Sequence, residues 1–135
     1  MKEKWAIGLK TFVKKNNVEV IDGHLILYKA VRSNYSSWYR WMNKNVYRPG
    51  TLVEIPRGKV SDNRSIRCGP GLHVGTLRFV KEFAANHLLA RILVKVAVRP
   101  ENVVCVPIKE TGKIGVCQLQ VLSRVDRKTG AEIPE

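Results

Sequence analysis

Acidic side chains and long apolar runs are scarce in this sequence. Its 135 residues contain 11 Asp and Glu against 24 Lys and Arg, which gives a formal net charge of +13 at pH 7. No apolar run approaches the ~20 residues that a membrane-spanning helix needs. Lys10, Lys14 and Lys15 interrupt the N-terminal region before a signal-like apolar block can form. The sequence therefore predicts a soluble, strongly basic, intracellular protein.

Cysteine is also rare, and its distribution excludes a disulfide framework. Cys68, Cys105 and Cys117 are odd in number and widely separated, which is typical of a protein from a reducing compartment. The sequence has no Cys-x-x-Cys, and its three histidines lack the spacing of metal ligands. We therefore expect neither a metal site nor a cofactor.

The apolar content is nevertheless large enough for a folded core. Hydrophobic residues make up 44% of the chain, which excludes wholesale disorder despite the charge. The length fits one domain. We expect a single domain over residues 1–124, followed by a short C-terminal tail over residues 125–135.

Hydrophobic periodicity predicts two helices and a larger number of short strands. Residues 4–15 have the pattern of an amphipathic helix. Thr76 can cap a second helix to about Leu89, with Leu77, Val80, Ala84 and Leu88 on one face. Strands are expected at 18–21, 24–31, 51–55, 72–74, 91–99, 103–106 and 114–122. The order indicates an α+β fold: a twisted, mostly antiparallel sheet with an N-terminal helix and one helix packed after the Gly-Leu-His-Val segment.

Two shorter patterns add to this fold prediction. Asp22-Gly23 is a strong hairpin signal between the first two strands. In the last strand Cys117 shares a face with Leu119 and Val121, which predicts a buried, inert thiol. Residues 33–50 are polar and aromatic, and we expect a long loop that contains a helical turn.

The excess positive charge is concentrated in the middle of the chain. Residues 28–67 contain nine Lys and Arg against only Glu54 and Asp62, whereas residues 101–135 carry five charges of each sign. The basic segment also holds all four tyrosines and two of the three tryptophans. Because cations attract phosphate and aromatic faces stack on bases, this segment predicts an anionic partner. The stacking candidates are Tyr35, Trp38, Trp41 and Tyr47.

The alternative for the tryptophans is a structural role. Trp38 and Trp41 are three residues apart, as on one helical turn, and aromatic pairs at this spacing commonly belong to a core. In that case the neighbouring lysines are simply solvated.

Lys29 stands out because it interrupts an apolar strand. Leu25, Leu27 and Val31 share its face, and the opposite face of the strand is also apolar. A buried cation requires a partner, and a ligand anion is one candidate. Equally, Lys29 could extend to the edge of the sheet or pair with Glu54 or Asp62.

A second cluster follows at residues 62–75. Its glycines and Pro70 allow the backbone to approach a ligand closely, and His73 precedes the expected helix N-terminus, where amides favour an anion. It is neither a Walker loop nor a dinucleotide fingerprint. In the alternative reading His73 hydrogen-bonds a backbone group. The complete set of anion-binding candidates is Lys29, Arg32, Arg57, Arg64, Arg67 and His73.

An ordered series of motifs resembles a known family. The series includes Tyr28-Lys29-Ala30-Val31-Arg32, Ile55-Pro56-Arg57, Cys68-Gly69-Pro70-Gly71-Leu72-His73-Val74 and Pro100-Glu101-Asn102. It resembles, over roughly residues 21–124, the C-terminal domain of the rIIB lysis-inhibition proteins of T-even-like phages. The resemblance implies a bacteriophage protein in the cytoplasm of the infected host, linked to lysis inhibition or counter-defence. Gly75 stands where the family pattern has a second cysteine, which weakens any shared redox or metal role.

Three classes of function remain. The favoured one is a non-enzymatic protein that binds nucleic acid or a nucleotide signal, because no base and nucleophile stand out as a pair by their spacing. An enzyme similar to ADP-ribosyltransferases is the alternative, but no acidic residue lies between Glu110 and Asp126, where such an enzyme needs a glutamate. A protein-interaction inhibitor of an acidic host factor is the third class. The sequence leaves the oligomeric state open.

Overall fold

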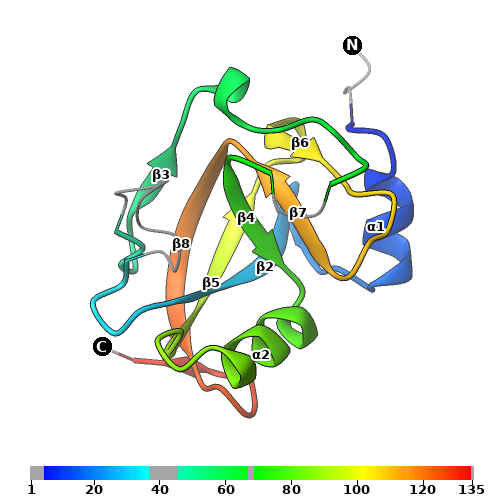
Figure 1. The fold of residues 1–135 in the computed structure, drawn as a ribbon. Coiled ribbons are helices and arrows are strands. Elements are labelled where there is room, and N and C mark those ends of the chain that lie inside the picture. Colours follow the sequence, from blue (N-terminus) through cyan, green and yellow to red (C-terminus); the bar gives the residue numbers. More distant parts are fainter. Residues whose placement is uncertain (1–4, 37–45, 67–68, 135) are drawn as a thin grey trace.

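A computed structural model describes residues 5–36, 46–66 and 69–134. Within these residues the chain forms two α-helices, nine strands and two short 3-10 helices (Figure 1). In chain order the elements are α1 (Leu9–Lys15), β1 (Val20–Ile21), β2 (His24–Val31), β3 (Leu52–Glu54), η1 (Arg57–Lys59), β4 (Leu72–Gly75), α2 (Leu77–Asn86), β5 (Ile92–Val98), η2 (Pro100–Asn102), β6 (Val103–Cys105), β7 (Lys113–Val116), β8 (Gln118–Val125) and β9 (Glu132–Ile133).

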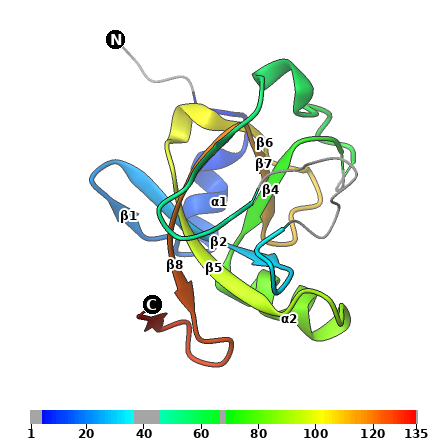
Figure 2. The ribbon, with the colours of Figure 1, turned by 90° about the vertical axis from the view of Figure 1, so that its left-hand side faces the viewer.

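All nine strands belong to one antiparallel sheet. Seven follow the order β3-β8-β5-β2-β4-β7-β6, while β1 pairs with β2 and β9 pairs with β8. The sheet is strongly twisted, with α1 and α2 on different sides of it (Figure 1). Seen from the side, the β1–β2 hairpin projects away from the sheet and α2 lies at the opposite lower corner (Figure 2). The predicted α+β class, with its N-terminal helix and its helix after the Gly-Leu-His-Val segment, is confirmed.

The two faces of the sheet bury two separate apolar clusters. The larger one joins the inward residues of the strands to Leu9 and Phe12 of α1, both at most 1% exposed. The smaller one lies under α2, where Val80 and Ala84 pack on outward residues of β2, β5 and β8. Alternation along the strands supplies both sets of contacts. The main core covers one face of β2 and β5, and α2 covers part of the other at Ala30 and Leu93, which explains the apolar character of these strands.

The turn and cap predicted from sequence are both present. Asp22 and Gly23 have φ of 50° and 77°, the positive values that a tight hairpin turn requires, and they bring Ile21 opposite His24. The Thr76 side chain accepts a hydrogen bond from the Phe79 amide and thereby caps α2.

α1 begins at Leu9, five residues later than the helix predicted over residues 4–15. Two later boundaries also differ from prediction. The single strand expected at 114–122 is two strands, β7 and β8, which pair with different neighbours and meet at Cys117. Cys117 is buried as predicted, at 7% exposure, and its amide donates to the Asn102 carbonyl at the bend. α2 ends at Asn86, so Leu88 is 86% exposed and does not join the apolar face of the helix. Periodicity alone cannot detect either change of direction, because the apolar pattern continues through it.

The C-terminal residues do not extend away from the sheet. Beyond Val125 the chain turns through Asp126, whose carboxylate accepts hydrogen bonds from the amides of Lys128 and Thr129. Residues Glu132–Ile133 then pair with β8 as β9.

Candidate functional site

The site forms where β2 and β4 separate. The two strands share a single register pair, Tyr28 opposite Gly75, although β2 continues to Val31 along β5. Lys29 is the first residue beyond this pair. Its side chain faces the main core and is 8% exposed. Among the described residues, Lys29 is the one charged residue that is buried. The sequence anomaly at Lys29 is therefore a real buried lysine.

Two uncharged groups hold the Lys29 ammonium. Its Nζ donates a hydrogen bond of 2.8 Å to the His73 carbonyl oxygen on β4. It also lies 5.1 Å from the ring centroid of Tyr47, a fully buried tyrosine whose π face favours a cation. Among the described residues no carboxylate forms an ion pair with Lys29, so the anticipated pairing with Glu54 or Asp62 is absent there.

A second cation raises the electrostatic cost at this position. Burial, and to a smaller extent the charge of Lys113 on β7, together lower the pKa of Lys29 to about 8. Lys113 is half-buried, and its Nζ lies 6.0 Å from the Phe79 ring centroid. At neutral pH two ammonium groups therefore influence each other across β4.

His73 does not add to this positive charge. Burial lowers its pKa to about 3, and the nearby Lys29 and Lys113 act in the same direction. Its side chain makes a hydrogen bond with the Gly69 backbone, as the structural alternative for this residue expected. The imidazole is therefore neutral at physiological pH, and the contribution of His73 to the cationic site is the carbonyl that holds Lys29.

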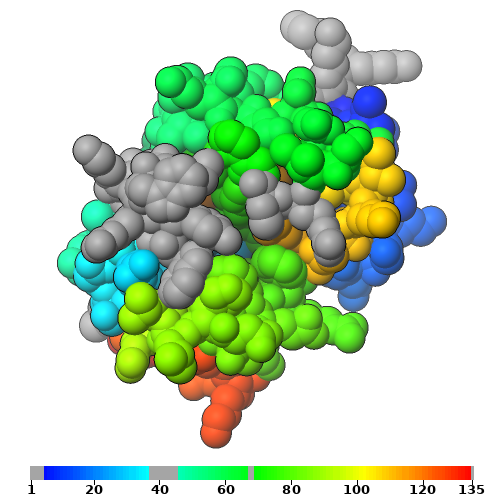
Figure 3. Space-filling model, in the orientation of Figure 1, coloured from blue at the N-terminus to red at the C-terminus, as the bar shows by residue number. Residues whose placement is uncertain are grey.

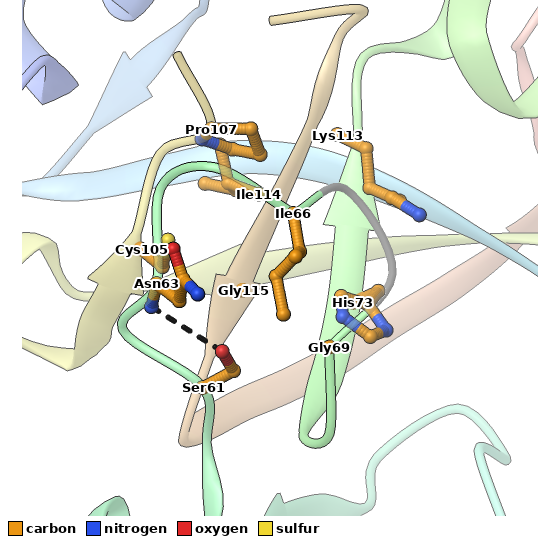
Figure 4. A pocket seen from close by; sticks show the side chains of 10 residues that line it. All are labelled: Ser61, Asn63, Ile66, Gly69, His73, Cys105, Pro107, Lys113, Ile114 and Gly115. Atoms are coloured by element: carbon orange, nitrogen blue, oxygen red, sulfur yellow. Dashed lines mark hydrogen bonds between the residues drawn. The ribbon is translucent and has the colours of Figure 1, made fainter. Parts of the chain in front are cut away.

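A small pocket adjoins His73 and Lys113 on the outward face of β4 and β7 (Figure 4). The 62–66 loop and Gly69 form one wall, and the absent side chain of Gly115 opens the floor. The pocket has room for about one water molecule. It can take one ligand oxygen, but a complete nucleotide base does not fit. Its lining residues are Ser61, Asn63, Ile66, Gly69, His73, Cys105, Pro107, Lys113, Ile114 and Gly115.

Residues 32–36 and 46–48, which we call the loop base, lie beside Lys29. The Tyr47 amide donates to the Tyr35 carbonyl at 2.8 Å, and the Arg32 amide donates to the Ser36 carbonyl at 2.9 Å. The Arg48 guanidinium lies 5.1 Å from the Tyr35 ring centroid. Because Tyr47 covers Lys29 and pairs with Tyr35, the loop base and the lysine pair form one continuous region, which we name the cationic centre: Lys29, Arg32, Tyr35, Tyr47, Arg48 and Lys113.

The aromatic candidates have different positions in the structure. Tyr35 is half-buried against Arg48, and Tyr47 lies in the main core, where its ring faces Lys29. Trp38 and Trp41 lie outside the described residues, and so does the helical turn expected around them. The stacking prediction for these tryptophans therefore stays a prediction.

Two of the remaining basic candidates, Arg57 and Arg64, donate hydrogen bonds to backbone carbonyls near β6. Arg57 donates to the carbonyl oxygens of Glu101 at 2.7 Å and Val103 at 3.4 Å. Arg64 donates through Nε to the Val106 carbonyl at 2.8 Å. Both guanidinium groups thus fix connecting segments beside β6. Arg67 lies outside the described residues. Figure 3 shows the surface of the molecule on the side where the 55–66 segment (green) and α2 (yellow-green) are exposed.

Replacing Arg57 by alanine tests this structural assignment. We expect a loss of about 1–2 kcal/mol in unfolding free energy, because two carbonyls lose a charged donor. Urea denaturation measures the loss. Affinity for a phosphate-bearing ligand should change no more than in Lys14→Met, which removes one exposed charge from α1. A variant of unchanged stability that fails to bind would instead make Arg57 a ligand contact.

Sequence reasoning missed Lys113. It lies in the C-terminal third, where positive and negative charges balance, so charge counting gave it no weight. A signal was present: Lys113 begins a short apolar strand that contains Gly115. Its proximity to Lys29 depends on the pairing of β7 with β4, which local pattern does not specify.

Two other kinds of feature are absent from the described part of the chain. In residues 5–36, 46–66 and 69–134 no helix has the length and apolarity needed to cross a membrane. The same residues contain no group of three or more His, Cys, Asp or Glu suited to hold a metal ion.

Comparisons with known proteins agree on one family. The sequence matches the family described as Bacteriophage T4 protein rIIB over residues 6–134. It is 34% identical over 125 residues to Protein rIIB of Enterobacteria phage T4, and the match covers 91% of this chain and 38% of that relative. The chain therefore spans less than half the length of the relative. No solved structure matches significantly. The family match over residues 6–134 and the identity to Protein rIIB show that the chain belongs to the bacteriophage T4 rIIB protein family.

Proposed function

We propose that this chain is a non-enzymatic phage protein that binds a phosphate-bearing partner, nucleic acid or a nucleotide signal, in the cytoplasm of the infected cell. One observation carries the proposal: Lys29 is buried beside Lys113 without a carboxylate partner among the described residues. A buried cation is unfavourable unless something compensates its charge. The carbonyl and the tyrosine ring compensate it in part, and a bound anion would complete the compensation.

The position of Lys113 favours phosphate as that anion. Lys113 is more accessible than Lys29 and lines the small pocket beside His73. A phosphate oxygen in this pocket would contact Lys113 directly and lie in the field of Lys29, where burial reduces screening. Arg32 and Arg48 extend the positive potential along the loop base. The pocket has room for one phosphate oxygen, whereas a nucleotide base is too large to enter it.

The family supports the biological setting of the proposal. A bacteriophage protein acts in the infected host, and membership of the rIIB family favours a role in lysis inhibition or counter-defence. Because the chain covers 38% of Protein rIIB, its proposed activity is that of the shared region.

Affinity measurements at increasing salt concentration test the proposal. The probes are a single-stranded DNA oligonucleotide, ATP and inorganic phosphate, and mass spectrometry of material copurified from infected cells identifies the natural ligand. A polymer should bind with an affinity that falls steeply with salt, in proportion to the phosphates contacted. A nucleotide should give a shallower slope and compete with inorganic phosphate.

A matched pair of variants locates the binding site. Lys113→Gln should weaken phosphate binding by about tenfold, the equivalent of 1.4 kcal/mol. Lys14→Gln removes the same charge from the exposed face of α1 and should have only a small effect. Equal effects of the two variants, or copurification of an acidic protein without any phosphate-bearing ligand, would contradict the proposed site.

A further inference from the structure

A broad groove lies on the outer face of the sheet, beyond the area that α2 covers. Outward residues of β2, β5 and β8 form its floor, while β1, β3 and β9 form its sides. Its volume is about 500 Å³. The lining residues are Ile21, Asp22, His24, Ile26, Leu52, Lys95, Ala97, Arg99, Gln118, Gln120, Leu122 and Glu132. α2 packs near Ala30, Leu93 and Val125 at the other end of the same face.

Large apolar side chains gather around this groove although they are exposed. Leu52 is 55% exposed, Ile21 is 46% and Leu122 is 41%. Exposed apolar side chains that gather around one groove, next to polar groups, are typical of a protein interface.

The charges of the groove distinguish it from the rest of the molecule. The positive charges of Lys95 and Arg99 equal in number the negative charges of Asp22 and Glu132. Lys95 Nζ lies 3.5 Å from Glu132 Oε1. The groove is therefore neutral in a chain of net charge +13. Two copies of so basic a protein repel each other over most of their surface. A neutral face that carries both signs and an apolar rim can meet itself, because each sign finds its opposite on the other copy.

From these observations we propose that the groove is the interface of a homodimer. A stable interface buries about 800 Å² on each partner, a tenth of the 8241 Å² accessible surface of this chain. The groove and the adjoining strands β1, β3 and β9 provide a contiguous surface for this contact. The inference is independent of the proposed function, because it uses none of the residues of the cationic centre.

Sedimentation equilibrium of the purified protein over a range of micromolar concentrations tests the dimer. The wild type should approach twice the chain mass of 15.3 kDa. Leu52→Lys and Leu122→Lys should each raise the dimer dissociation constant by at least about tenfold, because each introduces an uncompensated charge into apolar contact. Both side chains are exposed, so the monomer fold is retained, and circular dichroism checks it.

Leu88→Lys is the matched control. Leu88 is 86% exposed at the end of α2 and lies outside the groove, so its replacement should leave dimerisation unchanged. Added salt should strengthen the dimer by screening the repulsion between copies, whereas it weakens binding of phosphate ligands. A wild type that stays monomeric, or a dimer that Leu52→Lys and Leu122→Lys leave intact, would overturn the proposal.

Discussion

Replacing Lys29 by methionine is expected to stabilise the free protein while weakening its binding to phosphate. Methionine has a similar length and no charge. The pKa of Lys29 falls from 10.5 to about 8, mainly through burial, which corresponds to a cost of about 3 kcal/mol at neutral pH. The variant removes that cost and loses one hydrogen bond to the His73 carbonyl, worth about 1 kcal/mol. A net gain of about 2 kcal/mol should appear in urea denaturation at pH 7.

The pH dependence of stability provides a separate check on Lys29. Between pH 8 and 10.5 the unfolded chain keeps the Lys29 proton and the folded chain releases it. Folding therefore becomes more favourable as pH rises through this range, by about 3 kcal/mol for the wild type. Below pH 8 both states hold the proton, and the contribution of Lys29 is constant. The stability advantage of Lys29→Met should therefore vanish over the same interval and reverse by about 1 kcal/mol at its upper end.

Binding distinguishes a functional lysine from a merely tolerated one. Lys29→Met should weaken phosphate binding at least about tenfold, whereas Lys14→Met, which removes the same net charge, should have little effect. A variant that is more stable and binds as well as the wild type would show that Lys29 has no role in anion recognition. A less stable variant would contradict the desolvation argument itself.

Gly75→Ala is expected to destabilise the fold by about 2–3 kcal/mol. A Cβ atom at Gly75 would lie 2.5 Å from the Gly112 carbonyl oxygen and 2.9 Å from Phe79 Cδ1. The carbonyl cannot move away easily, because it accepts the Thr76 amide at 2.9 Å beside the cap of α2. The added methyl group would therefore push β4 away from both the turn before β7 and the first turn of α2. Thermal and urea denaturation measure the loss.

Gly58→Ala is the control for this prediction. Gly58 lies in the exposed helix η1, where a Cβ atom would meet nothing within 4 Å. The change should leave stability within about 0.5 kcal/mol of the wild type, or raise it slightly, because alanine restricts the unfolded chain. If the two variants were equally stable, close packing at Gly75 would not be the reason for a glycine there.

Much of the local structure was predictable because it depends on neighbouring residues. The bounds of β2 follow from continuous apolar character between the Asp22-Gly23 turn and Arg32. The start of α2 follows from the hydroxyl of Thr76. The division of residues 113–125 into β7 and β8 was not predictable, because it depends on which strands each half pairs with.

The sequence by itself determined that Lys29 lies on the apolar face of a strand, between Leu27 and Val31, but it left open whether the ammonium is buried or extends to the sheet edge. Only the tertiary structure decided what surrounds it. Separation of β2 from β4 brings the His73 carbonyl to its ammonium, and pairing of β4 with β7 brings Lys113 near. The same folding directs Arg57 and Arg64 to backbone carbonyls elsewhere. Composition fixes the number of charges, but long-range strand pairing decides which of them lie close together and which are buried.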